Sequence, residues 1–330
     1  MFQKSIDFKK LRTGRETVYF VFLTVTSLLI WSFLFFSMYR QFTTPTSPNT
    51  SKDGCFVRDK FNNKVYKIDK KYLLPSESCI SWNNLYENEK EQLLQAENGV
   101  VEKTIASLTT PVFVLFFLLF GLFSQYLAIA YIRMNAVKVG PNQLPEIWQI
   151  AEELSRELNL TKQPDVFIML GEGVLNAFAT KLIHRKIIVV YSELVVALLE
   201  KNSTKELKAV LGHEMGHHAL SHTKLRVEWL LLPVSFVPFL MALLSRQREF
   251  SADRVMTVIS NNTENSKRAL IKLIAGKDLG NQTDIALYLK QAKEEKGFFA
   301  FLSERLATHP HIPNRINAVE SFAKEYFKKQ

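Results

Sequence analysis

Two long apolar runs dominate the first part of the chain. Residues 18–39 and residues 111–132 each extend for 22 positions without a charged side chain. A helix of about 20 apolar residues crosses about 30 Å of hydrocarbon, so both runs are predicted to be transmembrane helices. The first run is too long for the apolar region of a cleaved signal peptide, and its end offers no small-residue cleavage site. We therefore expect it to remain as an anchor.

A third apolar stretch, residues 230–244, is shorter and contains Pro233 and Pro238. Two crossings would need about 40 residues, and only 23 lie between His222 and Arg246. The stretch is therefore predicted to be a membrane-contacting or re-entrant hairpin, with a buried core segment as the alternative.

Residues 133–330 alternate between the periods of strands and of helices. Three strands are predicted, at residues 165–170, 174–179 and 186–191. Four helices are predicted, at residues 143–158, 192–199, 204–222 and 267–275. Ser203 and Glu206 have the form of a capping box before the third helix. The pattern predicts a mainly helical α+β domain with a small β-sheet.

The charge distribution indicates how the chain crosses the membrane. The basic leader, residues 1–17, carries five basic against two acidic side chains, which favours a cytoplasmic N-terminus. The loop of residues 40–110 has nearly balanced charge and is long enough to be translocated, so we expect it outside. The second span then returns the chain, and residues 133–330 form a cytoplasmic domain.

Both cysteines of the chain, Cys55 and Cys79, fall in this outer loop. An oxidising compartment would allow one disulfide between them, and a pair of free thiols is the alternative.

The chain as a whole is basic, with a net charge of +10. A surplus of positive charge suits a surface held near anionic lipid. No nucleic-acid-binding module or platform of aromatic and basic residues is present. We therefore expect the lipid bilayer as a partner and no nucleic acid.

The most specific chemical signal is the segment from His213 to His217, which contains Glu214 and Gly216. Two histidines four positions apart on a helix can bind one metal ion, and Glu214 would lie beside the metal-bound water as a general base. Zinc is favoured by two imidazoles and a carboxylate, and catalytic zinc takes three protein ligands. A third ligand is therefore needed from elsewhere in the chain.

Glu249 is the predicted third ligand, and Asp253, one helical turn further on, is predicted to orient one of the histidines. Glu228 is a weaker alternative for the third ligand. His218 and His222 do not share the metal-facing side of the helix well, so we expect both on its polar face. One metal ion cannot bind residues on opposite sides of a bilayer, which excludes a single crossing by residues 230–244.

With these motifs, the sequence resembles the membrane-bound zinc metallopeptidases typified by the bacterial heat-shock protease HtpX and, more distantly, the CAAX prenyl proteases. The resemblance covers roughly residues 133–325. It is strengthened by residues 176–179, which look like the edge-strand motif of that family. Thr308-His309-Pro310, followed by Arg315, looks like its late histidine-proline segment.

The resemblance implies a gluzincin-like zinc metallopeptidase domain that holds one Zn²⁺ per chain. Glu214 would be the base and later the proton donor. His309, and with less support Asn176 and Arg315, would donate hydrogen bonds to the oxyanion that forms during hydrolysis. An ion-pair role for Arg315 is the alternative. Ala177 and Phe178 would belong to an edge strand that binds an extended substrate backbone.

The implied biological role is quality control under stress, in which unfolded or membrane proteins are hydrolysed. The implied location is a bacterial inner membrane, with the active site facing the cytoplasm. Two other functions remain open: a dedicated processing protease of the CAAX type, and a catalytically silent zinc-binding membrane adaptor.

Overall fold

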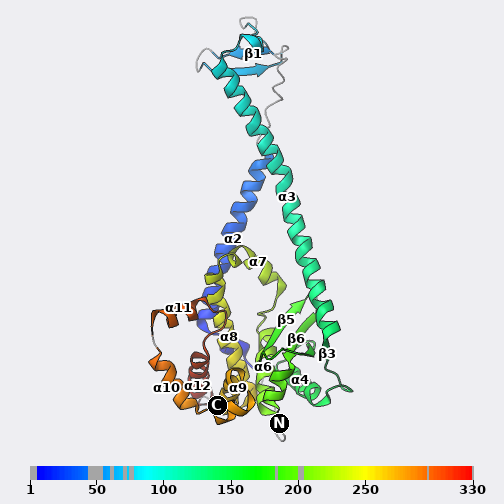
Figure 1. The fold of residues 1–330 in the computed structure, drawn as a ribbon, viewed down its shortest axis with the longest axis vertical. Helices are drawn as coiled ribbons and strands as arrows, with labels where there is room; N and C mark the ends of the chain where they lie inside the picture. Colours follow the sequence, from blue (N-terminus) through cyan, green and yellow to red (C-terminus); the bar gives the residue numbers. More distant parts are fainter. Residues whose placement is uncertain are drawn as a thin grey trace. The chain divides into compact units, whose positions relative to one another are not determined.

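Helices make up most of the described chain, and two small sheets accompany them (Figure 1). The computed structural model describes residues 6–43, 55–59, 63–69, 73, 78–182, 185–199, 204–295 and 297–328. The chain divides into two compact units, one from residues 1–30 and 123–330 and the other from residues 31–122. The predicted class, mainly helical α+β with a small sheet, is confirmed.

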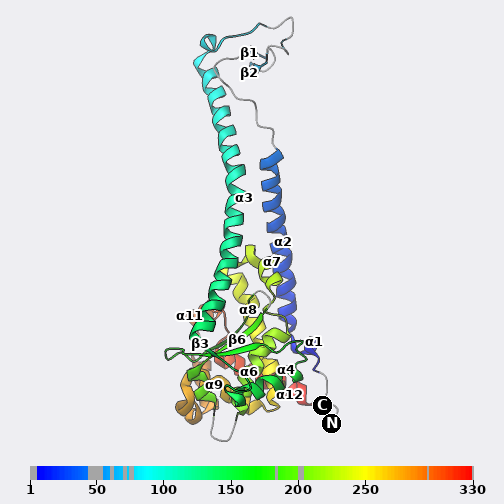
Figure 2. The same ribbon diagram turned by 90° about the vertical axis from the view of Figure 1, so that its right-hand side faces the viewer.

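The larger unit contains most of the secondary structure (Figures 1 and 2). Its strands are β3 (Ala136–Lys138), β4 (Asp165–Met169), β5 (Ala177–Leu182) and β6 (Arg185–Tyr191). Helices α2 and α3 pass from one unit into the other. The helices are α1 (Phe8–Leu11), α2 (Gly14–Thr43), α3 (Glu87–Asn135), α4 (Pro145–Glu157), α5 (Ser192–Leu198), α6 (Lys205–Ala219), α7 (Leu225–Ser235), α8 (Pro238–Ser260), α9 (Thr263–Gln282), α10 (Ile285–Glu294), α11 (Phe298–Leu306) and α12 (Ile312–Lys328).

The sheet of the larger unit has the strand order β3-β4-β6-β5. Strands β4 and β6 are parallel, whereas β3 and β5 run antiparallel to their neighbours. Ile188, Val189 and Val190 of β6 are fully buried, as expected for an inner strand covered on both faces. Strand β5 is an edge strand: among the described residues only β6 pairs with it.

Helix α6 lies between the sheet and helices α8 and α9. Leu207, Leu211 and Met215 are buried on it and belong to the main hydrophobic core. On the side that faces α8, a Cβ atom at Gly216 would lie 3.0 Å from the Cβ of Val255. A Cβ at Gly212 would lie 3.1 Å from a side-chain carbon of Ile259. The two glycines therefore let α6 and α8 approach more closely than larger residues would.

The described part of the predicted basic leader, residues 6–17, belongs to the larger unit and packs within it. Leu11 is 1% exposed and joins the main core. The backbone N–H of Thr13 donates to the Ser251 hydroxyl at 3.0 Å, and Arg12 donates to the carbonyl oxygen of Leu220. Helix α2 already begins at Gly14, so the start of the first apolar helix is held inside the protein.

Within the part of the chain that the structure describes, two helices are long and apolar enough to cross a membrane, over Gly14–Ser37 in α2 and Pro111–Asn135 in α3. They cover most of the two runs that the sequence predicts as spans.

Residues 230–244 form the helical hairpin α7–α8. Pro238 starts α8, where its missing N–H leaves no helical hydrogen bond unmade. Leu231 and Leu244 pack with Leu23 of α2, while Phe236 at the tip is 80% exposed. The hairpin thus combines a side packed against α2 with an exposed apolar tip.

The smaller unit contains strands β1 (Cys55–Arg58) and β2 (Val65–Ile68) and the short 3₁₀ helix η2 (Trp82–Asn84). A disulfide joins Cys55 to Cys79. The guanidinium of Arg58 donates two hydrogen bonds to the carboxylate of Glu89, at 2.7 and 3.0 Å. The sequence analysis did not predict the two strands.

Several element boundaries differ from the predicted ones. Strand β5 begins at Ala177 rather than residue 174, because the N–H of Val174 bonds the carbonyl of Gly171 and extends the turn. Helix α6 ends at Ala219 rather than His222, since Ser221 has a positive φ of 65°. Strand β3 was not predicted, because three residues give too short a pattern.

Two local predictions around α6 and α8 also need correction or completion. The sequence pattern around Glu249 and Asp253 predicts only a short helical stretch, whereas both carboxylates lie within the 23-residue helix α8. The predicted capping residue Ser203 lies outside the described residues. Glu206, its predicted partner, forms a 2.5 Å ion pair with the fully buried Lys272.

Substituting Gly216→Ala should destabilise the protein by about 1–3 kcal/mol, because the new methyl group must displace Val255 of α8. The higher helix propensity of alanine offsets at most about 1 kcal/mol of this. The measurement is the midpoint of thermal unfolding of the detergent-solubilised chain. Gly140→Ala is the control, since no atom lies within 4 Å of a Cβ there. Equal midpoints for the two variants would contradict the tight helix contact.

Candidate metal centre

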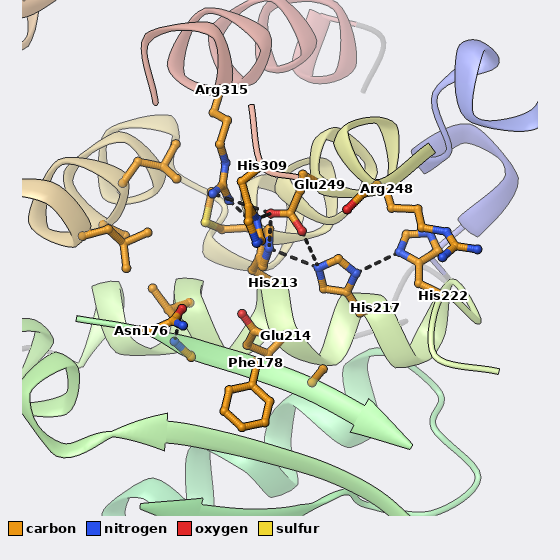
Figure 3. Close-up of a pocket in the computed structure, with 18 of the residues that line it drawn as sticks. Asn176, Phe178, His213, Glu214, His217, His222, Arg248, Glu249, His309 and Arg315 are labelled. Atoms are coloured by element: carbon orange, nitrogen blue, oxygen red, sulfur yellow. Dashed lines mark hydrogen bonds and ion pairs between the residues drawn. The ribbon is translucent and has the colours of Figure 1, made fainter. Parts of the chain in front are cut away.

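A cavity of about 440 Å³ lies between α6, α8 and the edge strand β5 (Figure 3). Strand β5 and the residues before it contribute positions 175–179 to the wall. Helix α6 contributes His213, Glu214 and His217, and α8 contributes Glu249. His309, from the segment between α11 and α12, lies in the wall. Helices α7, α9 and α12 also contribute to the wall, so the cavity joins residues from widely separated parts of the sequence.

Three side chains offer metal-binding atoms at one point of this cavity: His213, His217 and Glu249. The Nε2 atoms of the two histidines are 3.3 Å apart. Nε2 of His213 lies 3.4 Å from one carboxylate oxygen of Glu249, and Nε2 of His217 lies 3.4 Å from the other. A tetrahedron with zinc–ligand bonds of about 2.0–2.1 Å has edges of about 3.3–3.4 Å. The distance between the two imidazole nitrogens matches such an edge, and the donor atoms of all three side chains lie within 4.8 Å of one another.

The buried charges around these donors also fit a divalent cation. Glu214, Glu249 and Asp253 are each at most 7% exposed, and Arg315 is the basic residue buried among them at 6%. Three carboxylates and one guanidinium leave two negative charges if the histidines are neutral. Buried charge is costly unless it is compensated. A dication would balance the site.

Asp253 and Arg315 hold His213 through Nδ1, the ring nitrogen on the far side from the proposed metal position. Asp253 lies 3.0 Å from Nδ1 of His213. Arg315 donates two hydrogen bonds to the Asp253 carboxylate, at 2.6 and 2.9 Å. Burial raises the pKa of Asp253, but the charge and hydrogen bonds of Arg315 outweigh this and lower it. Nδ1 of His213 is thereby occupied, which leaves Nε2 for a metal.

His309 lies at the open side of the site. Its Nδ1 is 3.0 Å from an oxygen of Glu249, and its side chain is 67% exposed. The hydrogen bond to Glu249 raises the pKa of His309. Burial opposes ionisation of Glu249, but hydrogen bonds from its three histidine neighbours hold its pKa well below the usual value.

Arg315 is predicted to act either as a donor to the oxyanion or as an ion-pair partner, and its observed contacts are those of an ion pair. Its guanidinium is engaged by Asp253 and lies 3.6 Å from Glu249. Asn176 faces the cavity, and its side-chain oxygen accepts a hydrogen bond from the N–H of Ala177. Phe178 lines the same wall (Figure 3). Glu228 lines the cavity but is not among the three grouped donors.

The prediction that His222 lies on a polar face is wrong, because it is only 6% exposed. Its Nε2 is 3.1 Å from the carboxylate of Glu16, at the start of α2, and its Nδ1 is 2.9 Å from Nδ1 of His217. A carboxylate only accepts hydrogen bonds, so Nε2 of His222 must carry the proton. Nδ1 of His222 then accepts from His217, whose Nε2 is left for the metal.

No pattern in the sequence pointed to Glu16, because 206 residues separate it from His222. Its carboxylate also accepts a hydrogen bond from the hydroxyl of Ser251 and forms an ion pair with Arg12 at 3.3 Å. We call Glu16, His222 and His217 the histidine relay. It fixes one imidazole ligand as Asp253 and Arg315 fix the other.

His218 is likewise buried, at 4% exposed, rather than on a polar face. Its Nε2 donates to the carbonyl of Ile187 in β6 at 3.3 Å, and its Nδ1 accepts from the Thr223 hydroxyl at 2.9 Å. Burial lowers the pKa of His218 to about 4, so the ring is neutral near pH 7. This residue ties α6 to the sheet and does not face the metal-binding atoms.

Comparison with known proteins finds a matching family model, similar proteins and a similar solved structure. The model of Peptidase family M48 matches residues 141–237 and 228–323, together more than half of the chain. The Protease HtpX homolog of Streptococcus mutans is 22% identical over an alignment of 271 positions that covers 67% of this chain and 88% of that protein. The Protease HtpX homolog of Streptococcus equi subsp. equi is 26% identical over an alignment of 237 positions that covers 57% of this chain and 77% of that protein. Among solved structures, the crystal structure of S. mikatae Ste24p matches with a TM-score of 0.40 and 19% identity, covering 62% of this chain and 56% of that one.

The histidine relay predicts that His222→Ala weakens zinc binding about 10- to 100-fold, because His217 loses the group that orients its ring. The measurement is competition for zinc with a chromophoric chelator. His218→Ala is the matched control: it removes an equally buried histidine of the same region that does not contact a ligand. Equal zinc affinity in wild type and His222→Ala would contradict the relay.

His218 also predicts a loss of stability in mild acid. An unfolded histidine takes up a proton below about pH 6.5, whereas folded His218 stays neutral down to about pH 4. The unfolded state therefore binds more protons between these values, and stability falls as the pH falls. The contribution is on the order of 3 kcal/mol. Unfolding midpoints from pH 7.5 to 4.5 should decline less in His218→Asn than in wild type; parallel declines would contradict this assignment.

Proposed function

This chain belongs to peptidase family M48, and we propose that it is an integral-membrane, zinc-dependent endopeptidase that hydrolyses unfolded or membrane proteins. The observation that carries the proposal is the group of three donor side chains, with donor atoms within 4.8 Å of one another, in a cavity that also contains Glu214. The matched relatives named Protease HtpX homolog support the same activity.

His213, His217 and Glu249 would hold one zinc ion per chain. When bound there, the ion would polarise the substrate carbonyl and make an attacking water more acidic. Two carboxylate-supported imidazoles and one carboxylate are a donor set that zinc uses in peptidases.

Glu214 is the proposed general base. It follows His213 directly in α6, and its carboxylate points into the cavity between the ligand trio and β5 (Figure 3). From there it would accept a proton from the attacking water and later deliver it to the nitrogen of the leaving amine. It lies on the same helix as the two histidines, which places it beside the proposed zinc ion.

His309 is the proposed donor to the oxyanion. Its pKa is raised, so it carries a proton more readily, and its exposed ring reaches over the cavity from outside α6 and α8. The oxyanion is a short-lived negative charge, and a donor already aimed at it lowers the barrier. Asn176 can assist, because its side-chain oxygen is bonded to Ala177 and its amide N–H groups remain to donate. Arg315 acts through Asp253 as a positioning residue.

An extended substrate would bind along β5. The free side of this edge strand offers backbone N–H and C=O groups next to the site, and Ala177, Phe178 and Ala179 line the cavity. Main-chain pairing requires an unfolded segment and little sequence preference. This mode of binding supports a role in removing misfolded membrane proteins at a bacterial inner membrane.

The orientation of the chain is part of the proposal. Two candidate spans and the basic leader support an N-terminus and a catalytic domain on the cytoplasmic side, with residues 40–110 outside. The disulfide between Cys55 and Cys79 is in keeping with an oxidising outer compartment.

Glu214→Gln should lower the cleavage rate by about 10²- to 10⁴-fold, since the glutamine amide cannot accept the proton from water. The measurement is hydrolysis of unfolded casein by the zinc-loaded chain in detergent. Zinc content must be equal in variant and wild type. Glu228→Gln is the matched control, a second carboxylate of the cavity wall outside the ligand trio.

Equal cleavage by wild type and Glu214→Gln would contradict the role of Glu214 and indicate a contaminating protease. No cleavage by a zinc-loaded wild type would favour the catalytically silent adaptor. Loss of cleavage in Glu228→Gln as well would mean that the assay does not distinguish a general base from another carboxylate that lines the cavity.

A further inference from the structure

Helix α11 carries a face of large apolar side chains that the described part of the chain leaves uncovered. Phe298, Phe299, Phe301 and Leu306 are 69%, 80%, 55% and 60% exposed, and no residue of the helix is buried. Burying one such side chain contributes about 1.5–3 kcal/mol. Several adjacent ones in water are therefore a feature that calls for a specific environment.

The apolar side chains of α11 gather on one side of the helix. At 100° per residue, the phenylalanines and leucines fall on one side and Ser303 and Glu304 on the other. The polar side makes exposed contacts to the following segment: Glu304 accepts a hydrogen bond from Asn314 at 2.6 Å, and Ser303 lies 3.4 Å from a ring nitrogen of His311. These contacts leave the phenylalanine side without cover from the described residues.

The anchoring of α11 on α8 indicates what environment the phenylalanine side meets. Arg246 of α8 donates to the carbonyl oxygens of Arg305 and Ala307, at 2.7 and 3.0 Å. Two residues earlier on α8, Leu244 packs in one cluster with Leu23 of the candidate span in α2. Two residues of helix correspond to about 3 Å. The end of α11 is thus held close to the height of Leu23 along the candidate membrane span in α2.

The exposed tip of the α7–α8 hairpin lies at the start of α8, before Leu244 and away from Arg246. Phe236, Val237 and Phe239 there are 80%, 46% and 46% exposed. Following α8 from the tip, the chain passes apolar exposed residues, then Leu244, then Arg246, and then the ligand Glu249. An exposed apolar tip followed by a buried charged segment, with Arg246 4% exposed, is the order expected for a hairpin whose tip enters hydrocarbon and whose base lies in the protein. Helix α11 is attached to this base through Arg246.

We propose that α11 is an interfacial helix that lays its phenylalanine face into the lipid bilayer that α2 crosses. Arg305, stacked on the ring of Phe301 at 4.8 Å, and Lys290 and Lys293 of the preceding helix would meet anionic headgroups. The occupant of this face is lipid rather than a second protein.

This contact would also reach the active site. His309 follows the last residue of α11 by three positions, and Arg246 holds the carbonyl of Ala307 between them. A bilayer that fixes α11 would therefore help to hold His309 against Glu249, at 3.0 Å. The lipid contact itself does not depend on the proposed protease activity, whereas this coupling rests on it.

The test of the lipid contact uses the full chain in nanodiscs with anionic phospholipid. A polarity-sensitive fluorophore is attached to Phe299→Cys and, as a control, to Lys324→Cys on an exposed position of α12. Labelling without reductant keeps the disulfide of Cys55 and Cys79 closed, and labelled wild type measures the background. Quenching is compared between lipids brominated near the headgroup end of the chains and aqueous iodide.

We expect brominated lipid to quench the label at position 299 at least threefold more than the label at 324, and iodide to show the reverse order. Equal access of iodide to both labels, with no effect of brominated lipid, would overturn the proposal and leave α11 in water. Protection of position 299 from both quenchers would also overturn it, in favour of a protein partner.

The coupling to His309 is tested separately by turnover in the same nanodiscs. Phe299→Asp should lower kcat at least threefold with unchanged zinc affinity, whereas Lys324→Asp should leave both unchanged. An unchanged kcat in Phe299→Asp would overturn the coupling but not the lipid contact. A wild type without cleavage would count against the proposed protease and leave the quenching result standing.

Discussion

The close approach of α6 to α8 is the constraint on which the rest of the structure depends. Gly212 and Gly216 lie on the face of α6 that meets Ile259 and Val255, and any larger side chain there would push the helices apart. The same contact brings the carboxylate of Glu249 to 3.4 Å from both histidines of α6. Because metal–ligand bonds tolerate deviations of only about 0.2 Å, a small change in helix spacing would dismantle the site.

A second constraint is electrostatic and follows from the first. Bringing the two helices together buries Glu214, Glu249 and Asp253 in one place, and a low-dielectric interior makes their mutual repulsion strong. Arg315 of α12 neutralises one charge by a two-point contact with Asp253. The remaining charge gives the proposed site its preference for a divalent cation, so the packing of helices and the choice of cofactor are linked.

The start of the first membrane-span candidate is also part of the site. Glu16 lies at the beginning of α2 and holds His222, which holds His217. The hydroxyl of Ser251 and the guanidinium of Arg12 engage the same carboxylate. The N-terminal segment is therefore a structural component of the candidate metal centre as well as the start of a candidate span. Helix α11 is connected to the same site, because the segment that carries His309 follows it directly in the chain.

The sequence by itself determined the features that depend on local spacing. Histidines four positions apart on a helix share a face, apolar runs of 22 residues form long helices, and the runs at 165–170 and 186–191 form strands β4 and β6. These follow from the geometry of one helix or one strand. Periodicity also fixed the mainly helical class, but it could not find β3, which is too short to show a pattern.

Only the tertiary structure decided which distant residues meet. It buried His218 and His222, which helical geometry alone assigns to a polar face, because the sheet covers one and α2 covers the other. It brought Glu16 into contact with His222, 206 residues away, and Arg315 into contact with Asp253. It also turned the phenylalanines of α11 outward. Helical periodicity tells which residues share a face, but what covers that face depends on long-range packing, and that physical difference separates what the sequence determined from what the fold decided.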